Sequence, residues 1–298
     1  ERTIKTQRSR LKIKRIKLMN QNRIIKKGSQ FLKNKNIGSY LLDTEIILSD
    51  LLGISREKLI LRDKFELSKK EILKFKESIT RRAKYEPIAY IVKKKEFWKR
   101  NFFVNRETLI PRPETELLVE KIIKHFRGKS PYILDIGTGS GCILLSILED
   151  INKARGVGID LSKKALSVAK KNSISSDCFH RVKFLNKSVD DFINKKFDIV
   201  VSNPPYICKN DIKNLDNDIK YFEPKVALDG GNDGLDVIRK VIYKSKTILK
   251  TNGLLAIEIG NKQYKQVSQL LKIGSFREKD LIRDYQDNIR CIISTFIN

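Results

Sequence analysis

The sequence predicts an α/β protein with a mostly parallel sheet, preceded by a small helical domain. Residues 20–86 repeat apolar side chains at helical spacing, and beyond Pro113 short apolar runs alternate with amphipathic segments. Such alternation is typical of parallel strands joined by right-handed helical crossovers. We therefore assign 20–86 to an N-terminal helical domain, 87–112 to a connecting β-hairpin or linker, and 113–298 to an α/β domain.

Residues 1–19 are a basic segment for which we expect disorder. Residues 1–36 hold thirteen Lys and Arg against one acid, and the first eighteen residues show no sustained apolar face. A segment of this kind buries too little apolar surface to offset the entropy of ordering. We expect native translation to start at Met19, the only methionine, with an organelle-targeting segment as the alternative.

Three helices are expected in the N-terminal domain. Ser39 is placed at the start of the second helix and Gly53 at its end, and Ser68 with Glu71 has the spacing of a capping box. The apolar residues that define the helical faces are Ile24, Ile25, Phe31, Leu32, Leu42, Ile46, Ile47, Leu51, Ile72, Leu73, Phe75 and Ile79.

The remaining elements follow from β-rich and alternating patterns. Residues 88–104 are rich in Ile, Val, Tyr and Phe and predict a hairpin. In the α/β domain we expect strands at 131–136, 156–160, 181–186, 197–202, 253–259, 276–284 and 289–297. The helices are expected at 114–126, 140–150, 162–173, 234–250 and 262–272.

The composition excludes several classes of protein. No apolar run reaches the ~18 residues of a membrane span, and no secretory signal is present, so we expect a soluble, cytoplasmic protein. The four cysteines form no C-x-x-C pair and are interpreted as reduced structural thiols. The two histidines, His125 and His180, have no cysteine or carboxylate at ligand spacing, so no metal is expected.

The net charge of +27 invites a nucleic-acid partner but does not require one. Residues 1–36 account for +12 of it, which leaves +15 over 49 basic and 34 acidic positions. Much of this remainder is lysine dispersed among asparagine and isoleucine, as on a solvated surface.

A glycine-rich turn follows the first expected strand of the α/β domain. It consists of Gly137, Thr138, Gly139, Ser140 and Gly141. Glycines let the backbone approach a ligand, and the N-terminus of the next helix offers free N–H groups. We predict that these five residues bind a cofactor.

The identity of that cofactor depends on two further positions. A dinucleotide fingerprint requires a third glycine where Cys142 stands. Asp160 ends the next expected strand, where a carboxylate can accept hydrogen bonds from both hydroxyls of an adenosine ribose. Alternatively, Asp160 only caps the helix that starts at Ser162. A ribose-binding acid without a pyrophosphate cradle favours S-adenosyl-L-methionine over NAD.

The most specific motif is Asn203-Pro204-Pro205-Tyr206, which follows the strand 197–202. Two prolines stiffen the loop and remove two N–H donors. The Asn203 side-chain oxygen and the Pro204 carbonyl can then accept the two hydrogens of a substrate NH2 group. Tyr206 can pack on its planar face. We predict Asn203, Pro204 and Tyr206 as catalytic residues and all four as substrate-binding residues, with Asn203 also close to the cofactor. Terminating the strand is the alternative role.

With these motifs the chain resembles the HemK/PrmC family, the N5-glutamine methyltransferases of peptide chain release factors. The resemblance spans about residues 20–298. The supporting segments are Glu86 to Tyr90, Glu96 to Trp98, Thr108 to Glu116, Asp135 to Gly141, Asn203 to Tyr206, Phe222 to Pro224, Ala227 to Gly231, Glu258 to Gly260 and Arg283 to Arg290.

The resemblance implies a class I, Rossmann-like methyltransferase domain that uses S-adenosyl-L-methionine. The implied substrate is the glutamine of the Gly-Gly-Gln loop in class I release factors, with the N-terminal helices helping to recognise the factor. We expect a monomer. A ribosomal-protein glutamine, and a nucleic-acid amino group at adenine N6 or guanine N2, are alternative targets. A noncatalytic RNA-binding protein is a third possibility.

Three positions depart from the family pattern. Lys93 stands where the family usually has glycine, and Gln286 replaces a frequent glycine in the closing turn. Ser188 and Val189 stand near the positions where the family has an acidic and an aromatic residue beside the adenine. We keep Val189 as a cofactor-binding residue.

Overall fold

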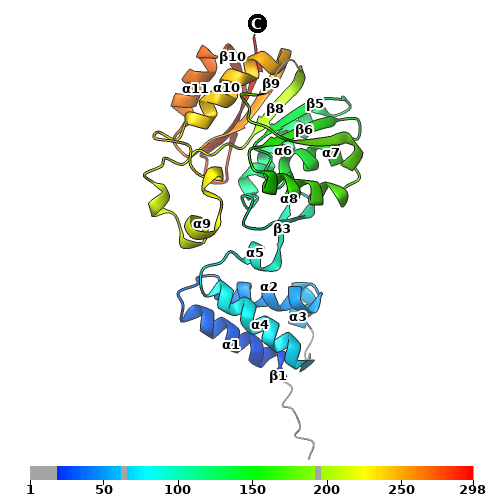
Figure 1. The fold of residues 1–298 in the computed structure, drawn as a ribbon, viewed down its shortest axis with the longest axis vertical. Helices are drawn as coiled ribbons and strands as arrows, with labels where there is room; N and C mark the ends of the chain where they lie inside the picture. The colour runs from blue at the N-terminus through cyan, green and yellow to red at the C-terminus, as the bar shows by residue number, and fades with distance from the viewer. Residues whose placement is uncertain (1–18, 62–65, 192–195, 298) are drawn as a thin grey trace, which may run out of the picture. The chain divides into compact units, whose positions relative to one another are not determined.

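A computed structural model describes residues 19–61, 66–191 and 196–297 (Figure 1). Residues 1–18 of the segment for which we expect disorder therefore lie outside the described residues. The chain divides into two compact units, Glu1–Ile88 and Ala89–Asn298. No helix in the described ranges is long and apolar enough to cross a membrane.

The first unit consists of helices and one short pair of strands. The helices are α1 (Gln21–Lys33), α2 (Tyr40–Leu52), α3 (Arg56–Leu61) and α4 (Lys69–Arg82). Strand β1 (Met19–Asn20) pairs antiparallel with β2 (Glu66–Leu67). The core between the helices contains Ile24, Leu32, Ile47, Leu48, Phe75 and Ile79.

The predicted helix ends are partly confirmed. Gly53 ends α2 in the left-handed conformation with φ 64°, and Ser68 and Glu71 form the capping box of α4. Ser39 does not cap α2 through its side chain, because its hydroxyl donates to Asp43 Oδ2 at 2.6 Å instead. Short polar side chains at helix starts have several local partners, so residue type alone does not decide among them.

Several predicted core residues of the first unit are exposed. Phe31, Leu42 and Leu73 are 43%, 42% and 68% exposed, whereas the polar Asp43 and Thr44 are buried. Helix α2 carries apolar residues on several sides, so helical periodicity does not define which face packs.

The boundary between the units falls within α5 (Ile88–Val92), which is followed by a hairpin of β3 (Lys94–Phe97) and β4 (Arg100–Phe103). The predicted strand was wrong over 88–92. Pro87 precedes this segment, and proline favours the first turn of a helix. Lys93 then reverses the chain with φ 56°, a conformation that glycine adopts without cost. This explains why glycine suits the position where this chain has lysine.

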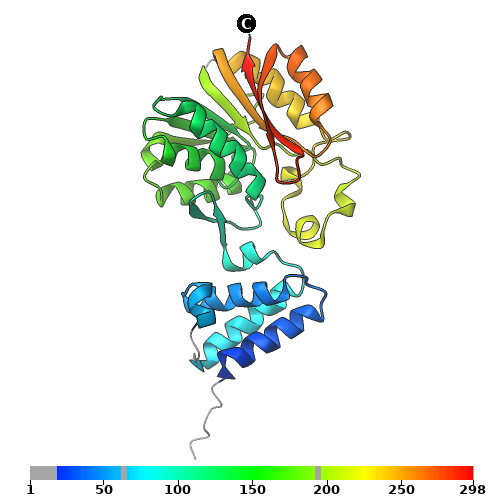
Figure 2. The same ribbon diagram turned by 180° about the vertical axis from the view of Figure 1, so that it is seen from behind.

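The central sheet has seven strands in the order β10-β11-β9-β8-β5-β6-β7 (Figures 1 and 2). Strands β5 to β9 are parallel, and β10 and β11 add an antiparallel pair. Their bounds are β5 Tyr132–Ile136, β6 Arg155–Asp160, β7 Val182–Asn186, β8 Phe197–Ser202, β9 Leu249–Glu258, β10 Phe276–Arg283 and β11 Ile289–Phe296. The predicted fold class is confirmed.

Helices cover both faces of this sheet. One core packs α6 (Pro113–Phe126) and α7 (Cys142–Asp150) on the strands, and the other packs α10 (Asp236–Ile248) and α11 (Tyr264–Ile273). Helix α8 (Lys163–Ile174) joins β6 to β7, and the short α9 (Asn217–Phe222) was not predicted. The predicted helix over 234–250 ends at Ile248, because Leu249 already begins β9.

The strand order reverses at β5. From β5 the chain runs to β6 and β7 on one side and then returns to β8 on the other. Ser202 at the end of β8 lies beside Ile136 at the end of β5, and its hydroxyl donates to the Ile136 carbonyl at 2.8 Å. A reversal of this kind opens a crevice at the carboxyl ends of the strands. It therefore brings the glycine turn and the Asn203 loop together.

Candidate active site

The glycine turn folds back between β5 and α7 with three residues in the left-handed region. Gly137, Gly139 and Gly141 have φ angles of 72°, 55° and 80°, which glycine adopts without steric cost. The Gly137 and Thr138 N–H groups donate to the Ile159 carbonyl at 2.9 and 3.0 Å. The turn is therefore tied to the end of β6.

Asp160 links this turn to the start of α8. Its Oδ2 accepts from the Gly139 N–H at 3.0 Å, and its Oδ1 accepts from the Ser162 N–H at 2.8 Å. Each carboxylate oxygen retains capacity for a further hydrogen bond. Burial raises the pKa of Asp160, and these backbone N–H groups oppose the rise. Asp160 is thus held by the loop and still offers two acceptors.

A second carboxyl lies beneath the turn. Asp135 is 1% exposed, and its Oδ2 accepts from the Thr138 hydroxyl at 2.6 Å. Burial raises the pKa of Asp135 to about 7, and the Thr138 hydrogen bond opposes the rise.

A cavity of about 480 Å³ adjoins these groups. This volume lies within the range of small-molecule sites. The predicted residues that line it are Gly137, Thr138, Gly139, Ser140, Asp160, Val189, Asn203 and Pro205. A Cβ added to Gly137 would meet nothing within 4 Å, so the turn borders open space. An adenosyl group with a carboxylate partner for its ribose fits this combination.

Three other predicted residues do not line the cavity. A Cβ on Gly141 would meet Leu145 at 3.1 Å and Ala169 at 3.4 Å, so this glycine serves close packing behind the turn. Pro204 is buried, and Tyr206 is half-buried against the core beneath β8 and β9.

Asn203 is joined to two residues that lie far from it in sequence. Its Nδ2 donates to Thr115 Oγ1 at 3.3 Å, and the Thr115 hydroxyl donates to Glu258 Oε2 at 2.6 Å. Thr115 belongs to α6 and Glu258 ends β9. Burial raises the pKa of Glu258 to about 7, while the Thr115 hydrogen bond, the nearby Arg290 charge and a hydrogen bond from the Asn203 side chain oppose the rise.

Tyr206 is held at both ends. Its carbonyl accepts from Gln263 Nε2 at 3.0 Å, and its hydroxyl accepts from Arg290 Nη2 at 3.2 Å. Gln263 Oε1 also accepts from the Gly260 N–H at 2.8 Å. These contacts fix the end of the Asn203 loop to the turn after β9 and to β11.

A buried ion pair closes another side of the cavity. Arg112, a lining residue, donates through Nη2 to Glu223 Oε1 at 2.5 Å, and the Ile110 N–H donates to Glu223 Oε2 at 3.2 Å. The Glu223 side chain is only 1% exposed. Burial raises its pKa, and Arg112 opposes the rise.

Thr115, Glu258, Gln263, Arg290 and the Arg112–Glu223 pair were not predicted as site residues. The segments that carry several of them supported the family resemblance, but residue type and local spacing gave them no role. Their roles depend on neighbours that are distant in sequence.

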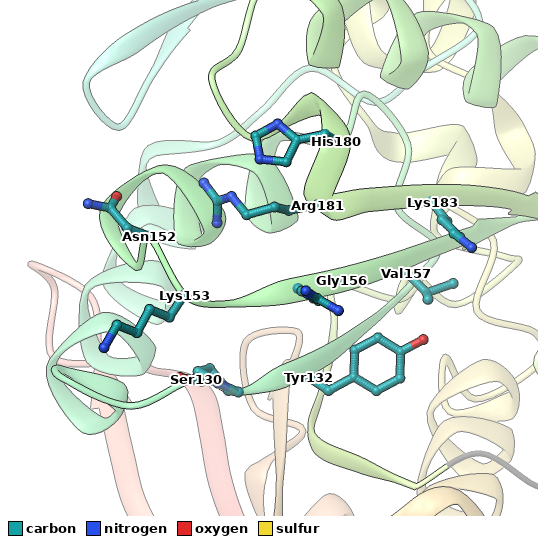
Figure 3. A pocket seen from close by; sticks show the side chains of 11 residues that line it. Ser130, Tyr132, Asn152, Lys153, Gly156, Val157, His180, Arg181 and Lys183 are labelled. Carbon is teal, nitrogen blue, oxygen red and sulfur yellow. The ribbon is translucent and has the colours of Figure 1, made fainter.

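A larger hollow of about 940 Å³ lies at the opposite, amino-terminal end of the strands (Figure 3). Its charged lining residues are Lys153, Arg155, Arg181 and Lys183. Arg181 is occupied by the carbonyls of Ile151 and Ala154, at 3.2 and 2.9 Å. No predicted site residue lines this hollow.

The four cysteines are free thiols. The described residues contain no group of three or more His, Cys, Asp or Glu side chains that could hold a metal ion.

Two family models match the chain. The PrmC N-terminal domain matches residues 23–92, and the methyltransferase small domain matches residues 113–218.

Curated relatives cover most of the chain. The release factor glutamine methyltransferase of Buchnera aphidicola subsp. Acyrthosiphon pisum is 39% identical over 92% of this chain and 98% of its own length. Those of Caulobacter vibrioides and Clostridium acetobutylicum are each 36% identical, over 88% and 90% of this chain and 91% and 95% of theirs.

Among solved structures, the hMettl16 catalytic domain in complex with the MAT2A 3′UTR hairpin 1 has a TM-score of 0.52. The alignment covers 80% of this chain and 85% of that chain at 16% identity, so it shows similarity of fold alone.

Proposed function

The chain belongs to the release factor glutamine methyltransferase family, and we propose that it methylates the side-chain amide nitrogen of the Gly-Gly-Gln glutamine in class I release factors. The methyl donor is S-adenosylmethionine. One observation carries the proposal: Asn203, an acceptor for an amide NH2 group, lines the same cavity as the glycine turn and Asp160.

In this proposal the donor is held by the glycine turn and its neighbours. Asp160 accepts from the ribose hydroxyls while its position is fixed by the Gly139 and Ser162 N–H groups. Val189, 8% exposed, lines the cavity and supplies an apolar wall for the adenine. When bound, the sulfonium supplies the methyl group.

The acceptor amide is positioned by the loop after β8. Asn203 Oδ1 accepts one amide hydrogen, which orients the nitrogen and makes its lone pair more available. The Pro204 carbonyl is proposed to accept the second, although Pro204 itself is buried and does not line the cavity. Pro205 lines the cavity beside them. The leaving thioether is neutral, so the extra proton can leave after transfer and the rate comes from alignment and preorganised dipoles.

The first unit is proposed to recognise the protein substrate. Leu41, Leu61 and Leu73 are exposed by 48%, 81% and 68% on its helices. In this proposal these side chains contact the release factor. The same proposal places the enzyme in the cytoplasm with the translation machinery, and a monomer remains the prediction.

The test uses labelled S-adenosylmethionine with three acceptors. These are a class I release factor, the same factor with its Gly-Gly-Gln glutamine replaced, and duplex DNA. We expect label on the first alone. Label on the altered factor or on DNA contradicts the assignment, the latter in favour of a nucleic-acid amino methyltransferase. A ribosomal-protein fraction, tested in parallel, addresses the other glutamine target.

A further inference from the structure

We propose that Thr115 and Glu258 are positioning residues that hold Asn203 with its carbonyl oxygen, and not its NH2 group, toward the acceptor amide. The inference rests on the proposed amide methylation and adds the device that sets the direction of Asn203. Neither residue needs to touch the substrate.

The direction of an asparagine amide matters at this position. One end of the side chain accepts hydrogen bonds and the other donates two. A glutamine NH2 group is a donor, so it pairs with Oδ1 and opposes Nδ2. A loop stiffened by Pro204 and Pro205 fixes the backbone, but rotation about the last side-chain bond exchanges the two ends. A further interaction is required to fix which of Oδ1 and Nδ2 faces the acceptor amide.

The hydrogen-bond chain from Glu258 makes that selection. Glu258 is fully buried and Thr115 is 2% exposed. An ionised carboxylate only accepts, so the one hydroxyl hydrogen of Thr115 is committed to Glu258 Oε2, at 2.6 Å. Thr115 Oγ1 can then act toward Asn203 only as an acceptor. Asn203 therefore presents Nδ2 to Thr115 Oγ1, at 3.3 Å, and to the Glu258 carboxylate.

The other end of Asn203 is left for the substrate. The side chain lines the donor cavity, and no residue in the described ranges donates a hydrogen bond to Asn203 Oδ1. The Glu258 carboxylate therefore fixes the direction of each hydrogen bond in the chain, so that Asn203 Oδ1 is left as a free acceptor in the proposed active site. A buried network of this kind is worth more than its single bonds, since each member fixes the direction of the next.

Burial of the Glu258 carboxylate destabilises the folded protein more than packing alone would justify. Glu258 is fully buried, and within the described residues the side chains that hydrogen-bond to it are those of Thr115 and Asn203. Burying an ionised carboxylate costs on the order of several kcal/mol unless its partners compensate. Such costs concentrate at functional sites, where the charge has a task.

The same chain predicts a dependence on pH. If Glu258 is protonated, it can donate to Thr115, whose hydroxyl hydrogen then turns to Asn203 and favours the reversed amide. The ionisable or charged groups around Glu258 are Arg290 and Cys291 on β11, Glu114 on α6, Tyr206 after β8 and Cys142 at the start of α7.

Most of these neighbours do not titrate with Glu258. Burial raises the pKa of Tyr206 and of Cys142 to about 12, and it raises that of Cys291 well above the usual thiol value. Burial raises the pKa of Glu258 to about 7. Since the ionised form is the active one, kcat is expected to rise as pH rises through this value.

The first test compares Thr115→Val with Thr115→Ser. Valine has nearly the same shape but no hydroxyl, so we expect kcat on the release factor to fall roughly 100-fold, the scale of a lost preorganised dipole. The KM for the factor and the Kd for S-adenosylmethionine should change less than about threefold. Serine keeps the hydroxyl and should retain kcat within about threefold.

Equal losses in the valine and serine variants would overturn the proposal, as would full activity of Thr115→Val. Thermal unfolding of both variants, compared with wild type, checks that the enzyme is folded at the assay temperature. If the wild type methylates no release factor, it is instead the proposed function that fails.

The second test follows kcat against pH in wild type and Glu258→Gln. A glutamine carbonyl can still accept from Thr115 but does not ionise. We expect the acidic limb of the wild-type profile, centred near the Glu258 value of about 7, to weaken in the variant, and any limb that remains to come from Asp135, whose pKa burial also raises to about 7. An unchanged limb in Glu258→Gln would assign the titration to another group and overturn this role.

Discussion

The two ends of the central sheet each carry a hollow, and they differ in construction. The hollow at the carboxyl ends has about 480 Å³ and borders Asp160, Asn203 and Thr115, which belong to networks with backbone and buried side-chain partners. The hollow at the amino ends has about 940 Å³ and is lined by dispersed basic side chains (Figure 3). Volume alone would favour the amino end, which none of the predicted site residues lines.

The two hollows differ in how their polar groups are held. Polar groups that are buried and joined in a chain have a fixed direction, so they are preorganised for a ligand. Exposed lysines such as Lys153 and Lys183 are solvated and keep their rotational freedom, so they select no single ligand geometry. The predictions below replace equivalent residues at the two ends.

The largest difference is expected in kcat when one asparagine at each end of the sheet is replaced by alanine. Asn203→Ala removes the proposed acceptor for the amide, and we expect kcat to fall roughly 1,000-fold with cofactor affinity changed less than about threefold. Asn152→Ala, in the amino-end hollow, should leave both unchanged. Steady-state kinetics and isothermal titration calorimetry measure the two quantities. A matching loss of cofactor affinity in Asn203→Ala would indicate a cofactor-binding or structural role.

The next largest difference is expected in the free energy of unfolding when one ion pair at each end of the sheet is broken. Arg112→Ala leaves the Glu223 carboxyl buried without its cation, and we expect a loss of about 3 kcal/mol in unfolding free energy at neutral pH. Lys250→Ala removes a pair with Asp198 whose side chains are 49% and 30% exposed, and should cost less than about 1 kcal/mol. Urea unfolding measures both.

The Arg112→Ala deficit should also shrink at acidic pH. Burial raises the pKa of Glu223, so the folded state favours its protonated form, and removing Arg112 strengthens that preference. Stability is then regained as pH falls. A deficit that is constant with pH would show that the loss comes from packing.

Aspartates should differ in cofactor affinity. Asp160→Ala removes the proposed ribose acceptor, and we expect the Kd for S-adenosylmethionine to rise about 30-fold, equivalent to about 2 kcal/mol. Asp177→Ala, an exposed change in the loop before β7, is the matched control and should have no effect. An unchanged Kd in Asp160→Ala would leave this residue only its role in holding Gly139 and Ser162.

The smallest effect is expected from charge reversal at the amino end. A variant with Lys153→Glu, Arg155→Glu and Lys183→Glu should retain kcat/KM on the release factor within about twofold, because these residues lie away from the donor cavity. Reversal of Lys265, Lys272 and Arg277, which are exposed elsewhere on the second unit, controls for net charge. A selective loss in the first variant would show that the larger hollow takes part in substrate binding.

The parts of the site that were predicted are those encoded locally. Three glycines in five residues allow left-handed backbone, and Asn203 followed by two prolines defines a rigid loop, so both motifs are visible without the fold. The strand pattern also placed them at one sheet edge. The fold class is confirmed for the same reason, because periodicity reports directly on buried strands and amphipathic helices.

The residues that were missed act over long separations. Thr115 lies 88 positions before Asn203 and 143 before Glu258, and it is an ordinary helical threonine in sequence. Gln263 and Arg290 likewise gain their roles only when β9 and β11 lie beside the Asn203 loop. In the first unit, the exposed Leu42 and buried Asp43 show the same limit, since the packed face of α2 is set by its neighbours.

The most direct test of the central claim is a crystal structure with S-adenosylhomocysteine and a glutamine peptide from the Gly-Gly-Gln loop. We expect Asn203 Oδ1 to lie within about 2.9 Å of the glutamine amide nitrogen, with Nδ2 still on Thr115. An amide bound elsewhere, or Asn203 directed away from the donor cavity, would contradict the account.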